Sequence, residues 1–181
     1  MIVTIPYAEG IVLNGHVIAS LVDQTVHNEF YFEKAGLPFA EVSGNDDARY
    51  TNICKSRNQC LEVMNLGLSR SNETCVAMND NDCQSLYRDN LSCAETFLIE
   101  HTDFAVVALT WETNIHPLRL EIKHVVQGLW VYHKRFFGLG LYFDHEPGGC
   151  ECQFMCDAIR SKGLRIGYLD SKKRLEHLKG K

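Results

Sequence analysis

The sequence predicts a single α+β domain over residues 1–181, in which one or two C-terminal helices close an antiparallel sheet. Three observations lead to this class. Hydrophobic residues make up 45% and charged residues 23% of the chain, as in an ordinary folded domain. Apolar and charged residues alternate over 118–123 with the period of two that half-buried strands show. The segment 43–95 is polar and cysteine-rich, which predicts a loop excursion from the sheet.

At the N-terminus, the dipeptide Asn14-Gly15 predicts a β-hairpin. Asn-Gly supplies the two positive φ angles that a type I′ turn demands. The flanking segments 11–13 and 16–22 are mostly apolar and would form the two strands. The aromatic run 30–32 predicts a further strand or a buried aromatic cluster.

Residues 96–143 predict an antiparallel meander that would pair with this hairpin. Glycines mark two of its turns, one at Gln127-Gly128 and the other at Gly138 and Gly140. The strands expected between the turns are rich in β-branched and aromatic residues. They are Thr96–Glu100, Phe104–Trp111, Leu118–Ile122, Leu129–Phe137 and Leu141–Phe143.

Two helices are expected after the meander. The first would run from Glu151 to Lys162 and end at Gly163, a residue that commonly terminates helices. Ser171 can cap a last short helix that ends near Leu178.

Charge and hydropathy exclude some functional classes. The formal net charge of −5 gives no global basic field, so the sequence carries no strong nucleic-acid signal. No apolar run of about 18 residues is present, so no membrane span is expected. The first residues lack the basic region of a signal peptide, which leaves an intracellular location open.

The eight cysteines are the unusual feature of the composition. An even number permits complete pairing, and thiols that are neither buried, catalytic nor metal-bound are a liability in a reducing compartment. Five cysteines lie in the segment 43–95 and three lie between residues 150 and 156. Both numbers are odd, so if all eight cysteines pair, at least one disulfide must join the two groups. That bridge would close a loop of at least 56 residues and contribute roughly 4 kcal/mol. The disulfide candidates are Cys54, Cys60, Cys75, Cys83, Cys93, Cys150, Cys152 and Cys156.

Two sequons, at Asn72 and Asn90, lie within the cysteine-rich segment. Each would accept an N-linked glycan in a secreted protein. Together with the cysteines, they favour a disulfide-stabilised extracellular or cell-surface interaction module without catalytic activity or a cofactor. Loops held by disulfides make good recognition surfaces, so the expected partner is another protein.

The alternative is an intracellular protein that binds zinc or another divalent metal. The side chains of His145, Cys150, Cys152 and Cys156 fall within twelve residues, and thiolates with imidazole suit tetrahedral zinc. A third possibility is that the cysteines are reduced and behave as small apolar residues.

The stretch from Leu141 to Gly149 is the most enzyme-like part of the sequence. A strand would deliver Asp144 and His145 to a glycine-rich turn, and a helix with Asp157 would follow. This arrangement resembles the strand–loop–helix of HNH (ββα-metal) nucleases. The resemblance implies that Asp144 and Asp157 bind a divalent cation and that His145 activates water, as in a hydrolase or nuclease. The same residues also suit a plain polar turn, and no family resemblance covers the whole chain.

Overall fold

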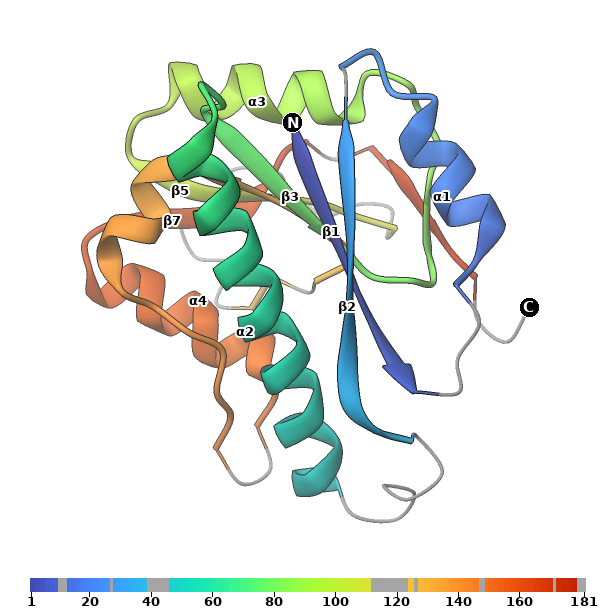
Figure 1. Ribbon diagram of the computed structural model, residues 1–181. Coiled ribbons are helices and arrows are strands. Elements are labelled where there is room, and N and C mark those ends of the chain that lie inside the picture. Colours follow the sequence, from blue (N-terminus) through green and yellow to red (C-terminus); the bar gives the residue numbers. More distant parts are fainter. Residues whose placement is uncertain are drawn as a thin grey trace.

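The computed structural model describes residues 1–9, 13–26, 28–38, 46–111, 124–125, 127–146, 149–170 and 172–178. In this part of the chain, a six-stranded sheet lies between two layers of helices (Figure 1). The elements in chain order are β1 (Ile2–Glu9), α1 (Gly15–Val22), β2 (Glu29–Pro38), α2 (Asp46–Arg70), β3 (Cys75–Asn79), β4 (Cys83–Ser85), α3 (Asn90–Glu100), β5 (Phe104–Leu109), β6 (Leu129–His133), the 3-10 helix η2 (Lys134–Leu139), α4 (Glu151–Ser161), β7 (Arg165–Tyr168) and β8 (Leu175–His177).

The main sheet is mixed, with the strand order β2-β1-β3-β6-β5-β7, so the predicted antiparallel sheet is wrong. Only β6 runs against its neighbours, and β1, β2, β3, β5 and β7 are parallel to one another. Every residue of β3, β5 and β6 is buried. Continuous burial is typical of strands that are covered by helices on both faces.

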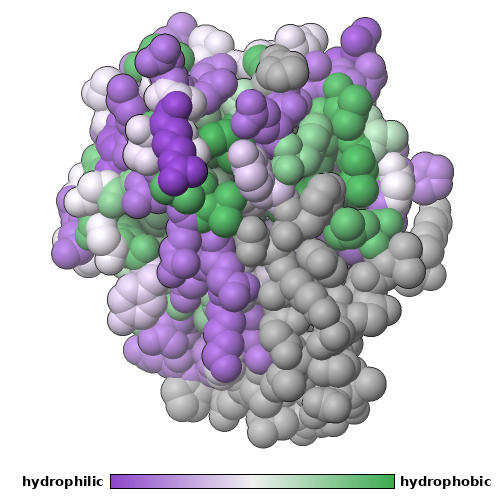
Figure 2. Space-filling view, viewed as in Figure 1, coloured by the Kyte–Doolittle hydropathy of each residue, from purple (hydrophilic) through white to green (hydrophobic). Residues whose placement is uncertain are grey.

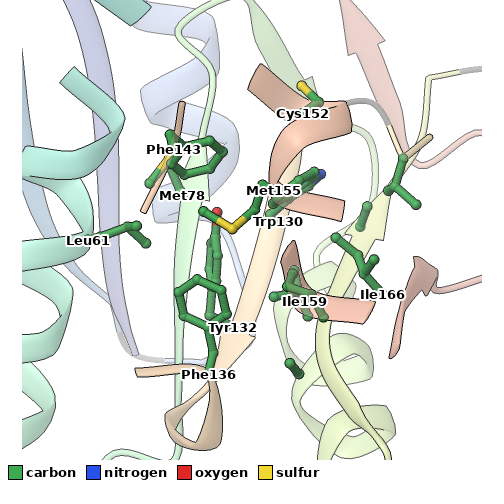
Figure 3. Close-up of a cluster of buried hydrophobic side chains, with 14 of the residues drawn as sticks. Leu61, Met78, Trp130, Tyr132, Phe136, Phe143, Cys152, Met155, Ile159 and Ile166 are labelled. Atoms are coloured by element: carbon green, nitrogen blue, oxygen red, sulfur yellow. The ribbon is translucent and has the colours of Figure 1, made fainter. Parts of the chain in front are cut away.

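The two faces of the sheet bury two separate cores. Alternate residues of β3 point to opposite sides: Val76 and Met78 pack with α2 and α4, whereas Cys75 and Ala77 pack with α1 and α3. The core under α2 and α4 is the more aromatic, and Figure 3 shows Trp130, Tyr132, Phe136 and Phe143 within it. The predicted small sheet domain is thus a three-layer α/β/α domain.

The predicted N-terminal hairpin is wrong, because Gly15–Val22 is helix α1. The side chain of Asn14 accepts a hydrogen bond from the backbone N–H of His16 and caps the helix. Val17 and Leu21, one helical turn apart, are buried. Asn14 therefore starts a helix instead of a turn, and residues 11 and 12 lie outside the described part. The expected strand at 30–32 lies within β2.

The cysteine-rich segment 43–95 is not a loop excursion. It contains the 25-residue helix α2, strands β3 and β4 and the first residues of α3. The apolar periodicity of α2 is weak because its buried face includes the polar residues Asn52, Ser56 and Arg57. Its outer face is mostly hydrophilic, as the surface over α2 in Figure 2 shows. None of the described helices is long and apolar enough to span a bilayer.

The predicted meander is only partly correct. The strands expected at 104–111 and 129–137 correspond to β5 and to β6 followed by η2. The strand expected at 96–100 is the end of helix α3, whose buried residues Leu91, Ala94 and Leu98 recur at helical spacing. Residues 118–122 lie outside the described part.

The segment 141–143 is not a strand either. The backbone N–H and carbonyl of Phe143 bond to the side-chain amide of Asn58, at 2.7 and 2.9 Å, instead of to a neighbouring strand.

The C-terminal predictions are correct for the first helix and wrong for the second. Helix α4 is present and is followed by Gly163 at φ 76°. In place of the last helix, strand β8 pairs with β4 in a separate antiparallel ladder. The backbone N–H groups of Arg174 and Leu175 both donate to the carbonyl of Thr110, which directs this segment towards β4.

The predicted disulfide framework is wrong, since all eight cysteines are free thiols. Six of the eight are buried, and the other two, Cys93 and Cys150, are half-buried. Burial raises the pKa of Cys54 and of Cys75 to about 12, so these thiols are neutral and unreactive at ordinary pH. Most of the cysteines therefore act as small apolar core residues.

The buried imidazole of His133 predicts a pH-dependent stability. Its Nδ1 accepts a hydrogen bond from the backbone N–H of Arg135, and burial, followed by the charges of Arg135 and Lys134, lowers its pKa to about 4. An unfolded histidine has a pKa of about 6.5, so the neutral ring stabilises the fold above that pH. This contribution, on the order of 1–3 kcal/mol, should be lost as the pH falls from about 6.5 to 4.

Urea denaturation at several pH values tests this expectation. The variant His133→Asn keeps a cap acceptor but cannot titrate, so its unfolding free energy should fall less steeply over the same pH range. Equal slopes for the variant and the wild type would contradict the assignment.

Candidate functional site

One edge of the main sheet gathers polar residues from segments far apart in the sequence. The carboxyl ends of the parallel strands lie at this edge, where the antiparallel β6 begins. Asp80 follows β3, Trp111 lies just beyond β5, and Gly128 immediately precedes β6. In open α/β sheets, ligands bind outside the carboxyl ends of the strands, so this edge is the candidate site.

A tight turn after β3 presents two carboxylates at this edge. The backbone N–H of Cys83 donates to the carbonyl of Asp80 at 3.1 Å, and the buried side-chain amide of Asn79 donates to the carbonyls of Asp80 and Cys83, both at 2.9 Å. The side chain of Asn81 accepts a hydrogen bond from the backbone N–H of Asn14. The turn is therefore fixed on both sides, which leaves Asp82 exposed at its tip.

The small ladder between β4 and β8 brings a histidine to this turn. Cys83 is paired with His177, and the backbone N–H of Leu178 donates to the carbonyl of Asp82 at 2.7 Å. As a result, His177 Nε2 lies 2.9 Å from Asp82 Oδ2. Donor atoms of Asp82, Cys83 and His177 all lie within 4.8 Å of one another.

The ring of Trp111 orients this histidine. Its indole stacks on the imidazole of His177, with the ring centroids 4.9 Å apart. Gly128 makes room for the indole, since a Cβ atom at this position would lie 2.4 Å from Trp111 Cζ3. The carbonyl of Gly128 also accepts the backbone N–H of Asp80 at 2.7 Å. One glycine thus supports both halves of the site.

Arg57, on α2, lies under the site and joins three anionic or thiol side chains. Its Nη2 donates to both carboxylate oxygens of Asp80, at 3.1 and 3.2 Å. Its Nη1 donates to Glu151 and lies 3.6 Å from the sulfur of Cys152. Arg57 and Glu151 are buried, so this ion-pair network links the turn after β3 to the N-terminus of α4.

Burial governs the ionisation of these groups. Burial raises the pKa of Asp80 to about 7, against the opposing effect of the Arg57 guanidinium. Burial likewise raises the pKa of Glu151, again opposed by Arg57. Loss of Arg57 would leave the buried Glu151 and the half-buried Asp80 without their cation.

The residues expected to form a nuclease-like site do not come together. Asp144 is exposed and accepts the backbone N–H of His145, whose Nε2 lies 3.2 Å from the hydroxyl of Thr51. Asp157 pairs with Gln153 and Arg160 on the surface of α4. None of the three belongs to a group of metal-donor atoms within the described residues.

The predicted set of His145, Cys150, Cys152 and Cys156 is divided in the structure. Cys150 and Cys152 lie together, but their histidine neighbour is His124. The sulfur of Cys156 faces Val125 instead, where it accepts a backbone N–H at 3.4 Å.

The two sequons differ in accessibility. Asn72 is exposed in the segment after α2. Asn90 is fully buried, and its side-chain amide donates to Ser85 Oγ and to the carbonyl of Arg174. A glycan cannot be attached to Asn90 in this fold.

Sequence reasoning missed Arg57, Trp111, the pair Asp80 and Asp82, and His177. A usable signal was present for the two aspartates, because Asp-Asn-Asp directly follows the apolar run Val76–Met78. Paired carboxylates at the end of a buried strand commonly bind cations. His177 carried no such signal, since only the β4–β8 ladder brings it to Asp82.

Comparison with known proteins identifies the fold. No protein-family model and no curated protein matches the sequence. Among solved structures, S. aureus TarS (residues 1–349) aligns with a TM-score of 0.63 and 16% identity, over 96% of this chain and 59% of that one. The mannosyltransferase PcManGT from Pyrobaculum calidifontis, in complex with GDP-Man and Mn²⁺, gives 0.58 and 12%, over 92% and 55%. The catalytic domain of Drosophila beta1,4galactosyltransferase 7 gives 0.56 and 16%, over 98% and 69%.

The chain therefore has the GT-A fold of these glycosyltransferases, with a mixed six-stranded central sheet. It spans a little over half the length of the TarS and PcManGT chains that it matches. Neither the predicted non-catalytic interaction module nor its nuclease-like alternative agrees with this fold. Both interpretations relied on cysteine and motif spacing, which does not show how strands are ordered in a sheet.

Replacement of Arg57 is expected to destabilise the protein strongly. Arg57→Met leaves the buried Glu151 and the half-buried Asp80 without a cation and should lower the unfolding free energy at pH 8 by about 3 kcal/mol. A second change, Glu151→Gln, should recover part of this loss. Chemical denaturation measures both effects.

The exposed pair of Arg88 and Asp23 provides the matched control. Arg88→Met removes the same charge but should cost less than about 1 kcal/mol. Similar losses for the two arginine variants would contradict the role given to Arg57.

Proposed function

We propose that this chain binds a nucleotide sugar through a divalent cation held by Asp82 and His177, and acts as the donor-binding part of a glycosyltransferase. One observation carries the proposal: His177 Nε2 and Asp82 Oδ2 lie 2.9 Å apart at the ligand-binding edge of a GT-A sheet. PcManGT is named a mannosyltransferase, the Drosophila protein is named a galactosyltransferase, and TarS has been solved in complex with UDP-GlcNAc, all of which agree with this class of reaction.

The donor atoms fit a cation such as Mn²⁺ or Mg²⁺. Both ions take carboxylate oxygens together with water and substrate phosphates, and Mn²⁺ is the ion named in the PcManGT complex. The Asp82 side chain is 53% exposed, which leaves room for phosphate oxygens and water around a bound ion. Stacking on Trp111 holds the imidazole of His177 beside that carboxylate.

When bound, the cation supplies positive charge that neutralises the diphosphate and stabilises it as a leaving group. The protein's own residues position this chemistry. Arg57 fixes the carboxylate of Asp80 from below, and Asn79 fixes the backbone of the turn. The turn is thus held in shape before a ligand arrives, which lowers the entropic cost of binding.

Nucleotide binding tests the proposal directly. UDP, GDP and ADP are titrated calorimetrically into the whole chain with and without Mn²⁺, and release of sugar from the matching nucleotide sugar is then measured. At least one nucleotide is expected to bind only with Mn²⁺. Asp82→Asn and His177→Gln should each weaken that binding tenfold or more, which corresponds to about 1.4 kcal/mol.

Asp103→Asn is the matched control, because Asp103 pairs with Arg165 at the opposite edge of the sheet. It should bind nucleotide as the wild type does. Nucleotide affinity that is independent of Mn²⁺ and unchanged in Asp82→Asn would refute the cation site, and failure to bind any of the nucleotides would refute the proposed function.

A further inference from the structure

A second group of possible metal ligands, two thiol sulfurs and one imidazole nitrogen, meets at the start of α4. It does not include Asp82 or His177. Cys150 is the N-cap of this helix and Cys152 lies in its first turn. His124 approaches from the segment before β6, and its Nε2 lies 3.1 Å from the sulfur of Cys150. The three donor atoms of His124, Cys150 and Cys152 all lie within 4.8 Å of one another.

We propose that His124, Cys150 and Cys152 form a zinc site. Two thiolates and an imidazole are the donors that tetrahedral Zn²⁺ prefers, at about 2.3 Å from sulfur and 2.1 Å from nitrogen. Those bond lengths put tetrahedral donors about 3.5–3.8 Å apart. In the structure the Cys150–His124 pair is 3.1 Å apart and all three donor atoms lie within 4.8 Å of one another. Small side-chain adjustments therefore suffice to hold the ion.

Groups around Cys152 suit a sulfur that carries negative charge. The guanidinium of Arg57 lies 3.6 Å from this sulfur. Donors of this kind orient metal-bound ligands and stabilise their charge. Cys152 is 5% exposed, at the edge of the core cluster in Figure 3, so the site has one buried wall.

Cys156 holds the histidine segment in position without being a ligand. Its sulfur accepts the backbone N–H of Val125 at 3.4 Å and lies one helical turn beyond Cys152. This contact fixes the residue next to His124 against α4. Of the four ligands that the sequence spacing suggested, two belong to the proposed site, Cys156 is an anchor, and His145 lies elsewhere, beside Thr51.

The fourth position of the proposed site faces solvent. His124 is exposed, and Cys150 lines an open groove of about 330 Å³ along α4. A zinc ion with three protein ligands keeps an open position for water or another small ligand. The inference is independent of the proposed nucleotide-sugar chemistry and implies no nuclease activity.

Cobalt substitution provides the test, because tetrahedral Co²⁺ with thiolate ligands absorbs light in the visible and near-ultraviolet ranges. The whole chain is kept reduced with a phosphine and titrated with Co²⁺, and Zn²⁺ is then added in competition with a chromogenic chelator. One equivalent of Co²⁺ should give thiolate-to-metal absorption that Zn²⁺ abolishes. Cys150→Ser and His124→Gln should each weaken zinc binding more than about tenfold.

Three control variants separate this site from the rest of the protein. Cys93→Ser removes the other half-buried thiol. Asp82→Asn and Cys83→Ser disrupt the donor group around His177. All three should keep the thiolate absorption, whether or not the chain binds nucleotides.

Two results would overturn the zinc site. The first is wild-type protein without thiolate-to-cobalt absorption, which would leave a hydrogen-bonded thiol and imidazole cluster only. The second is an absorption that persists in both Cys150→Ser and His124→Gln. His124 is exposed, so His124→Gln should remain folded and keep the test valid if Cys150→Ser does not fold.

Discussion

Both candidate sites, the one at Asp82 and His177 and the one at Cys150 and Cys152, depend on the contacts of the buried Arg57 guanidinium. It donates to Asp80 in the turn after β3 and to Glu151 at the start of α4, and it lies against the sulfur of Cys152. Only arginine offers several donors in a fixed plane, so one side chain can satisfy partners in different directions. Since burial raises the pKa of both carboxyl groups, their charged forms rely on this cation.

The second constraint is the path of the chain between β7 and β8. Arg174 is buried, donates to Asp170 and Asn90, and holds the segment beside α3. The carbonyl of Thr110 accepts the backbone N–H groups of Arg174 and Leu175, which directs β8 towards β4. His177 reaches Asp82 only because of this path. The segment between β7 and β8 thus includes a buried residue, Arg174, that positions the candidate cation ligand.

The sequence predicted local features of the fold better than long-range ones. Helix α4 and its stop at Gly163 were predicted, because caps and glycines act within a few residues. Asn14-Gly15 was misread, since the same dipeptide can open a turn or cap a helix. The long helix α2 was missed because polar residues such as Arg57 occupy its buried face. Sheet order and the meeting of Asp82 with His177 carried no local signal at all.

The two proposed metal sites can both lie near Arg57 because their ligand atoms differ in chemistry. Asp82 and His177 offer an oxygen and a nitrogen in an exposed place, whereas Cys150 and Cys152 offer sulfur beside a buried wall. Soft thiolates favour zinc, and carboxylates with phosphates and water favour manganese or magnesium, so ligand type can sort the ions. A zinc ion would also neutralise the two thiolates and leave Arg57 to the two carboxylates. Binding at the thiolate site would then stabilise the ion-pair network that holds Asp80 in place.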